Sequence, residues 1–303
     1  LKKKGAPAYD TTPNGYLTAQ NINSASLWQL YQRAGLIKPN EANGGHHIEL
    51  KAGLVYDSRE HEADPTRGIW AELYAYGSPD ILNGRGKDGY HYLKLAAHFR
   101  HYVPVYKDRV TFAYRIGTQN NIAGNSPFYM NTYLNTLFIQ RVMYEGLGGA
   151  NSLRGIMRNR ILANGFAYAN VELRTKVAKF DIGRQHFYIG LAPFFDLGLI
   201  TQPYKLDEQA IKEAYAKDCI ETGANILMGK DAVMPLDFDK YFAVDENQNL
   251  DQSKVYIPHM AAGLGLKVAM NENFVLSVDW AMALNKQDNA KWANFYIKMG
   301  YLF

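Results

Sequence analysis

The sequence predicts an all-β protein, an antiparallel transmembrane β-barrel with long extracellular loops that carry short helices. Apolar and polar residues alternate with a period of two over segments longer than ordinary strands. Long and short connections alternate between these segments, and the chain is rich in aromatic residues, with 22 Tyr and 14 Phe. No apolar run reaches the roughly 18 residues that a transmembrane helix needs. The expected membrane-crossing elements are therefore strands.

The amino-acid composition excludes several classes of protein function. The 303 residues include 33 Lys and Arg and 29 Asp and Glu, so the net charge of +4 is too small to predict nucleic-acid binding. An apolar fraction of 47% excludes general disorder. The single cysteine, Cys219, can form no internal disulfide and supports no zinc cluster. No arrangement of catalytic residues stands out, so we expect neither an enzyme nor a metal or cofactor site.

The segment 273–285 shows the alternation most clearly. Its even positions are apolar, whereas Ser277 and Asp279 lie among the odd positions. Such a strand presents one face to lipid and the other to a polar lumen. Its length fits a tilted membrane strand of about 9–11 residues better than a globular strand of about 5–6. The side chains expected to face lipid are Phe274, Leu276, Val278, Trp280, Met282 and Leu284.

The same alternation recurs along the chain and predicts nine strands. A soluble β-sandwich also alternates, but its strands are shorter and its apolar faces pack inward. The strands are expected over residues 46–58, 67–77, 90–104, 109–119, 167–177, 187–199, 256–270, 273–285 and 293–303.

Large aromatic residues near the ends of these strands predict the two interface girdles of a membrane barrel. Girdle residues would place their rings at the level of the lipid headgroups, on the face that points away from the lumen. The expected girdle residues are Trp70, Tyr74, Tyr102, Tyr256, Trp292 and Tyr301.

The connections predict how the chain is organised. Residues 1–45 are expected to form an extracellular loop segment with a short helix near 24–36, and residues 46–303 the barrel. Within the barrel, 120–163 is expected to be a loop inserted into the lumen, and 202–254 an extracellular loop with a helix over 206–218. The connection 78–89 is expected to be another long extracellular loop, and the short connections 104–109, 178–185 and 270–273 are expected to be periplasmic turns; the loop 285–291 is a short exception on the extracellular side.

The chain ends in an alternating aromatic strand that includes Tyr301 and Phe303. A terminal Phe in this context resembles the C-terminal sorting signal of bacterial outer-membrane proteins. The alternative, an ordinary edge strand that happens to end in Phe, stays open.

Four short motifs lie in a fixed order on the expected strands and connections. They are Asp57-x-Arg59 with Pro65-x-x-Gly68, Leu153-Arg154-Gly155-Ile156, Asn170-x-Glu172-x-Arg174 and Phe194-x-Asp196-x-Gly198. Together they resemble the BamA/TamA outer-membrane assembly superfamily, also called the bacterial surface antigen family. The resemblance covers residues 46–303 and is closest to short members from Bacteroides-like bacteria that have no POTRA domains. Ile156 departs from the family, which usually has an aromatic residue there.

Arg154 is the expected anchor of the loop 120–163. Glu172 and Asp196 share the lumenal parity of neighbouring strands, so both can face one guanidinium, whose planar fork suits carboxylates. Phe194 has the same parity and can stack on it, and Gly155 permits a tight turn behind it. A lumenal ion pair that only stabilises the barrel remains an alternative.

The resemblance implies an outer-membrane protein that helps to insert or translocate other proteins. The family barrel has sixteen strands, so we expect these nine to be its last nine, with further strands upstream. Expected partners are outer-membrane lipid and lipopolysaccharide, unfolded outer-membrane protein clients and subunits of an assembly complex. Two alternatives stay open: a passive channel or scaffold barrel, and a barrel fused to an enzyme that precedes residue 1.

Overall fold

The chain splits into two compact units in the computed structural model. One comprises residues 1–45 and 205–254, and the other residues 46–204 and 255–303. The structure describes residues 22–24, 27–33, 37–38, 41–42, 47–79, 91–107, 109–134, 143–204, 208–234, 246–247, 249, 251–271, 273–288 and 293–299.

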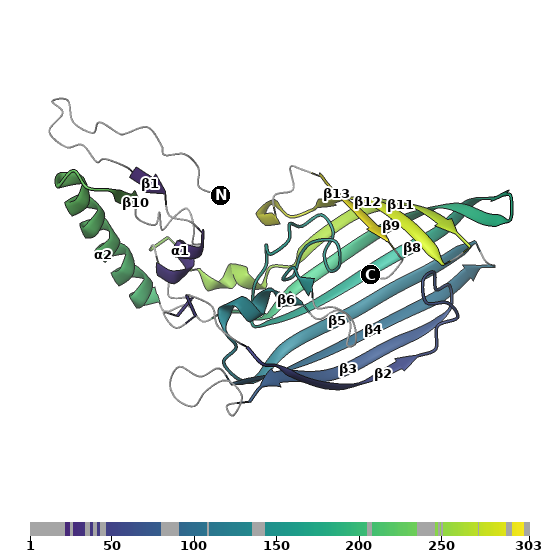
Figure 1. Ribbon diagram of the computed structural model, residues 1–303, viewed down its shortest axis with the longest axis horizontal. Coiled ribbons are helices and arrows are strands. Elements are labelled where there is room, and N and C mark those ends of the chain that lie inside the picture. Colours follow the sequence, from purple (N-terminus) through teal and green to yellow (C-terminus); the bar gives the residue numbers. More distant parts are fainter. Residues whose placement is uncertain are drawn as a thin grey trace. The chain divides into compact units, whose positions relative to one another are not determined.

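Nine strands of the larger unit form one antiparallel sheet, in which each strand pairs with its neighbours along the chain (Figure 1). The predicted all-β class and its nine strands are confirmed. In the described part of the chain, β13 and β2 form the two edges. The strands are β2 (Leu50–Asp57), β3 (Gly68–Ser78), β4 (Tyr92–Tyr106), β5 (Val110–Gly124), β8 (Gly165–Ile182), β9 (Gln185–Gln202), β11 (His259–Met270), β12 (Phe274–Ala283) and β13 (Ala293–Met299).

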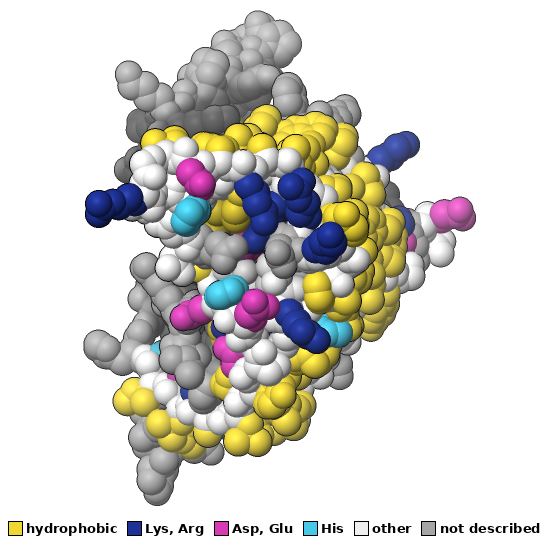
Figure 2. All heavy atoms as spheres, turned by 90° about the vertical axis from the view of Figure 1, so that its right-hand side faces the viewer, with side chains coloured by type: hydrophobic (Ala, Val, Ile, Leu, Met, Phe, Trp, Pro, Cys, Tyr) yellow, Lys and Arg dark blue, Asp and Glu magenta, His cyan; other side chains and the backbone are white. Residues whose placement is uncertain are grey.

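The sheet has two different faces. We call the face that packs against residues 145–163 the inner face, and the opposite face the outer face. Along β12, exposed and buried side chains alternate, and Asp279 on the inner face is fully buried. Figure 2 shows hydrophobic side chains over the outer surface and charged side chains gathered toward the end that faces the viewer. The predicted outward residues Phe274, Leu276, Trp280, Met282 and Leu284 are all exposed, and Val278 is half-buried.

The predicted aromatic girdle is wrong for three of its residues. Trp70, Tyr74 and Tyr102 are at most 8% exposed and lie on the inner face. Cations stack on them there: Arg59 and Arg100 lie over Trp70 at 3.7 and 5.1 Å from the ring centroid. A large ring fills inner space and offers a π-face to a buried guanidinium, so proximity to a strand end does not decide its direction. Trp292 and Tyr301 lie outside the described residues.

Several strand boundaries differ from the prediction. β8 and β9 extend beyond the predicted 167–177 and 187–199, so the expected connection 178–185 shrinks to residues 183–184, and β2 begins at Leu50 and not at residue 46. Two further differences have identifiable reasons. β5 continues to Gly124 because residues beyond 119 still pair with β4, from Asn120↔Leu95 to Gly124↔Tyr92. β11 begins at His259 and not near Tyr256, which lies in the 3-10 helix η2 (Gln252–Tyr256). Pro258 comes directly before β11, and proline has no backbone N–H to donate to a ladder.

The connection between β5 and β8 is not a plain loop. It contains a 3-10 helix η1 (Phe128–Thr132) and a two-stranded sheet of β6 (Tyr133–Leu134) and β7 (Met143–Tyr144). A third 3-10 helix, η3 (Lys286–Asp288), lies in the connection between β12 and β13.

The smaller unit contains two helices and a parallel pair of strands, β1 (Ile22–Ser24) and β10 (Ala232–Met234). Helix α1 (Leu27–Arg33) lies within the predicted range 24–36. Helix α2 (Glu208–Leu227) extends well beyond the predicted end at 218. It stops where Gly229 adopts a positive φ of 66° and backbone amides close the last turn, as in a glycine C-cap. Among the described residues, neither helix is long and apolar enough to cross a membrane.

Candidate functional site

Residues 145–163 fold back on themselves and pack on the inner face. Leu147 and Ile161 form an antiparallel bridge. Ser152 Oγ accepts from the Gly148 amide at 2.8 Å and donates to the Gly148 carbonyl at 3.0 Å. Apolar loop side chains then form a buried cluster with β8, which contains Leu147, Leu153, Ile156, Ile161, Phe166 and Tyr168. We call residues 145–163 the inner loop.

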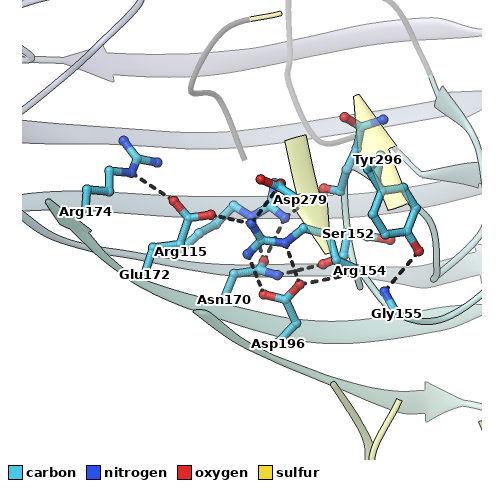
Figure 3. Close-up of polar contacts among 12 residues, drawn as sticks. Arg115, Ser152, Arg154, Gly155, Asn170, Glu172, Arg174, Asp196, Asp279 and Tyr296 are labelled. Carbon is cyan, nitrogen blue, oxygen red and sulfur yellow. Dashed lines mark hydrogen bonds and ion pairs between the residues drawn. The ribbon is translucent and has the colours of Figure 1, made fainter. Parts of the chain in front are cut away.

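Arg154 makes the main polar contacts of the inner loop (Figure 3). Its Nε and Nη2 donate to the two carboxylate oxygens of Asp196 at 2.9 Å each, and its backbone amide donates to Asp196 at 3.0 Å. Its Nη1 donates to Glu172 and, at 3.3 Å, to Asp279. The guanidinium carbon lies over the Phe194 ring, 3.5 Å from its centroid. Four of the five N–H donors of the planar guanidinium are used in this way, which requires carboxylates placed around it on several sides.

The three carboxylates come from three different strands. Glu172 lies on β8, Asp196 on β9 and Asp279 on β12, and all three side chains are at most 4% exposed. Asp196 pairs with Asn170 and Glu172 pairs with Phe194, so the two acids are diagonal neighbours on one face. The contacts join residues that are 18, 42 and 125 positions apart along the chain. Arg154 therefore fastens the inner loop to strands that the sequence separates widely.

Further cations balance these acids. Arg174 Nε donates to Glu172 at 2.9 Å, whereas Lys267 and Lys298 contact Asp279 at 2.6 and 3.2 Å. Buried charges are tolerable only when they are paired, and removing one partner strands the others. With Arg154, four cations from the inner loop, β8, β11 and β13 therefore surround three acids.

The charge of Arg154 is strongly favoured. Burial alone lowers the pKa of a guanidinium, because it disfavours the charged form. Asp196 and Glu172 outweigh this effect and raise the pKa of Arg154 well above its ordinary value. A raised pKa contributes stability below the unfolded-state value, so the contribution is complete throughout the neutral range.

A comparison with models of known protein families identifies the family of the chain. A model of the Omp85 superfamily domain matches residues 9–303. The chain belongs to the Omp85 superfamily. A comparison with curated proteins gives no match. The family agrees with the resemblance to BamA/TamA-type barrels, and it indicates an outer-membrane protein from a group that acts in protein insertion and translocation.

Two glycines of this Omp85 domain allow the inner loop to approach the sheet closely. Gly155 has a φ of 89°, and a Cβ there would lie 2.8 Å from the Met282 carbonyl carbon. A Cβ on Gly198 would overlap a methyl group of Leu153. Ile156, where the family usually has an aromatic residue, is fully buried in the apolar cluster. The predicted contacts of Arg154 with Asp196, Glu172 and Phe194 are thus present, while the anchoring role of the set stays a prediction.

Sequence reasoning missed several members of the site. It placed Asp279 on the inner face but did not connect it to Arg154. It also missed Arg115, which donates to Asn170 at 2.9 Å and to the Asn151 carbonyl of the inner loop at 2.7 Å. The available signal was a charged residue at an inner-face position of an otherwise apolar strand, and Lys267 and Lys298 share that signal with Asp279.

The turn between β2 and β3 carries the remaining Omp85 motif. Arg59 Nε and Nη2 donate to the carboxylate of Asp57 at 2.9 and 2.8 Å. Gly68 has a φ of 109° and lies against the backbone of the turn, where a Cβ would overlap the Ser58 carbonyl oxygen. Pro65 is buried. The neighbouring Asp64 accepts from Tyr188 on β9 at 2.6 Å, so the turn reaches across the inner face.

The predicted C-terminal signal, Tyr301 and Phe303, lies outside the described residues.

Proposed function

We propose that this Omp85 domain helps to insert or translocate proteins at the outer membrane by offering the edge of β13 to a client strand. No bond is made or broken in this function, and no metal or cofactor is needed. The expected partners are outer-membrane lipid and lipopolysaccharide on the outer face, with unfolded outer-membrane proteins and assembly-complex subunits as further partners.

The observation that carries the proposal is the buried network around Arg154. Its ion pairs connect the inner loop to β8, β9 and β12. The strands next to β13 are therefore fixed by contacts on the inner face as well as by their backbone hydrogen bonds. When the strands beside an edge strand are rigid, the edge offers an incoming strand a fixed template for its backbone hydrogen bonds.

The edge itself has suitable chemistry. β13 pairs with β12 from Met299↔Leu276 to Ala293↔Met282 and forms one edge of the described sheet. Its outward side chains Phe295, Ile297 and Met299 are 71–75% exposed. An exposed apolar edge strand is a pairing site for another strand. In a membrane the same side chains contact lipid.

Site-specific photo-crosslinking in the native outer membrane tests the proposal. A photo-reactive amino acid replaces Ile297 on β13 in one variant and Leu266 on β11 in the matched control, which is also outward-facing and exposed. We expect adducts with newly made outer-membrane proteins at Ile297 and only lipid adducts at Leu266. Equal protein adducts at both positions, or none at Ile297 in a correctly folded variant, would contradict the proposal. The second outcome would favour a passive channel or scaffold.

A further inference from the structure

The inner loop also holds the edge strand β13, through side chains that the family motifs do not include. Alternate residues of β13 point to the inner face. Three of them, at successive inner-face positions, each form a hydrogen bond with the backbone of the inner loop. Asn294 Nδ2 donates to the Gly155 carbonyl at 2.8 Å, the Gly155 amide donates to Tyr296 Oη at 2.9 Å, and Lys298 Nζ donates to the Ala150 carbonyl at 3.0 Å.

Two of these three contacts converge on Gly155. Both backbone polar groups of Gly155, its amide and its carbonyl, bond to β13, and Figure 3 shows the Tyr296 hydroxyl reaching the amide. A Cβ at this position would lie 3.0 Å from the Met282 carbonyl oxygen of β12 and 3.1 Å from the Ala261 Cβ of β11. The loop backbone is therefore pressed onto the last strands of the sheet.

The anchor and the edge strand also share a carboxylate. Asp279 lies directly across the ladder from Tyr296 and contacts both Arg154 and Lys298. A change in the position of Arg154 would therefore affect both the adjacent Gly155 backbone and Asp279, which is the partner of Lys298. Two groups that bias one another through shared contacts are coupled, and the coupling is reciprocal.

We propose that Asn294, Tyr296 and Lys298 form a latch by which the inner loop controls how firmly β13 pairs with β12. When Arg154 is seated on its carboxylates, the latch is closed and β13 is held by its ladder and by the loop. When the loop withdraws, β13 keeps only its ladder with β12, and its edge opens more often. For a client protein, this consequence rests on the proposed function; the latch itself does not.

Hydrogen exchange of the whole protein in lipid nanodiscs, without any client, tests the latch in both directions. From the strand side, the double variant Asn294→Ala, Tyr296→Phe removes the bonds to Gly155 and leaves Arg154 and its carboxylates in place. We expect amides of residues 145–163 to exchange about tenfold faster, because each side-chain hydrogen bond is worth roughly a factor of two to ten. Amides of the β8–β9 hairpin keep their rate.

From the loop side, Arg154→Lys weakens the anchor without touching β13. We expect amides of residues 293–299 to exchange several-fold faster than in the native protein. The matched control is Phe295→Leu, which alters the outer face of the same strand and meets no loop atom. It is expected to leave residues 145–163 unchanged.

Two outcomes overturn the latch. One is native exchange in residues 145–163 for the folded double variant. The other is equal acceleration by Phe295→Leu, which would indicate general fraying of an edge strand. If the double variant does not fold, Tyr296→Phe alone removes one hydroxyl and keeps the ring, and the same direction is expected with a two- to tenfold effect. The exchange experiment contains no client protein, so a negative crosslinking result does not affect it. A negative exchange result likewise leaves the crosslinking test of the proposed function unaffected.

Discussion

Two arginines of this chain each bind an aspartate through a bidentate fork and lie over an aromatic ring, in two different places. Arg154 and Arg59 each donate Nε and Nη2 to both oxygens of an aspartate, at 2.8–2.9 Å. Each also lies over an aromatic ring, Phe194 at 3.5 Å and Trp70 at 3.7 Å from the centroid. The two sites therefore share one geometry of guanidinium fork, carboxylate and ring.

The difference lies in what each arginine joins. Arg59 binds Asp57, two residues away; the Arg59 side chain is only 3% exposed, as that of Arg154 is, but the Asp57 side chain is 41% exposed. Arg154 binds an acid 42 residues away and two more from other strands, all at most 3% exposed. A local pair shapes a turn, and water can replace it. A buried pair between distant segments fixes tertiary structure, and nothing replaces it when one partner is lost.

The largest expected effect is that of Arg154→Ala. It leaves Asp196, Glu172 and Asp279 buried with less compensation, so we expect the free energy of unfolding to fall by about 3–5 kcal/mol. The measurement is urea unfolding in lipid. The folded fraction at each urea concentration is read from the band of the folded form, whose electrophoretic mobility changes on heating. Arg154→Lys should recover part of the loss, because Lys keeps the charge but not the bidentate fork. A loss under about 1 kcal/mol for Arg154→Ala would make the two arginines equivalent and remove the anchor.

An arginine introduced by substitution on the outer face, where it has no acidic partner, extends the comparison. Val278 pairs with Leu266 and Ile297, so an Arg there meets apolar neighbours and lipid. We expect Val278→Arg to lower the free energy of unfolding by about 2–4 kcal/mol if the position lies near the membrane midplane. Val278→Met is the control, because it keeps an apolar side chain. Unfolding in lipid measures both, and an equal effect of both substitutions would contradict a lipid-facing outer surface.

The motif glycines give a further contrast. We expect Gly198→Ala to cost about 1–3 kcal/mol, because the added methyl overlaps Leu153 in a packed site. A second substitution, Leu153→Val or Leu153→Ala, should restore part of that loss. Gly68→Ala is strained by its φ of 109° and by the Ser58 backbone, so no trimmed side chain should rescue it. Absence of rescue at Gly198 would show that the loop contact seen there does not limit the substitution.

Much of the fold could be predicted, because alternation along a strand is a local property. Nine strands and their outward faces follow from the period of two. The contacts of Arg154 could be predicted for Glu172, Asp196 and Phe194, since these lie on neighbouring strands with a common parity. Asp279 and the latch residues could not be linked to Arg154, because register between distant strands and the path of a loop are not written in any local pattern.

The aromatic residues show a second limit of local pattern. Trp70, Tyr74 and Tyr102 have the size and the position of girdle residues, yet they lie inside. The inner face carries the buried guanidiniums Arg100 and Arg115, and rings supply both volume and a π-face beside them. The direction of a strand residue is set by its parity relative to its neighbours, and parity outweighs residue type.

The smallest expected effect is that of Arg59→Ala, about 1 kcal/mol in the free energy of unfolding. An ion pair whose carboxylate is open to water is worth about 0–1 kcal/mol, and a cation over an indole adds about 0.5–1 kcal/mol. Asp57 remains open to water after the substitution, and Trp70 keeps Arg100 as a second cation over its ring. Neither partner is stranded, which is the physical difference from Arg154.

Matched double-mutant cycles in urea unfolding measure this difference directly. One cycle combines Arg59→Ala with Asp57→Asn, and the other combines Arg154→Ala with Asp196→Asn. We expect a coupling energy below about 1 kcal/mol for the turn pair and about 1–3 kcal/mol for the buried pair. Equal couplings would mean that burial and sequence separation do not set the strength of these contacts. The shared geometry of fork, carboxylate and ring would then account for both sites alone.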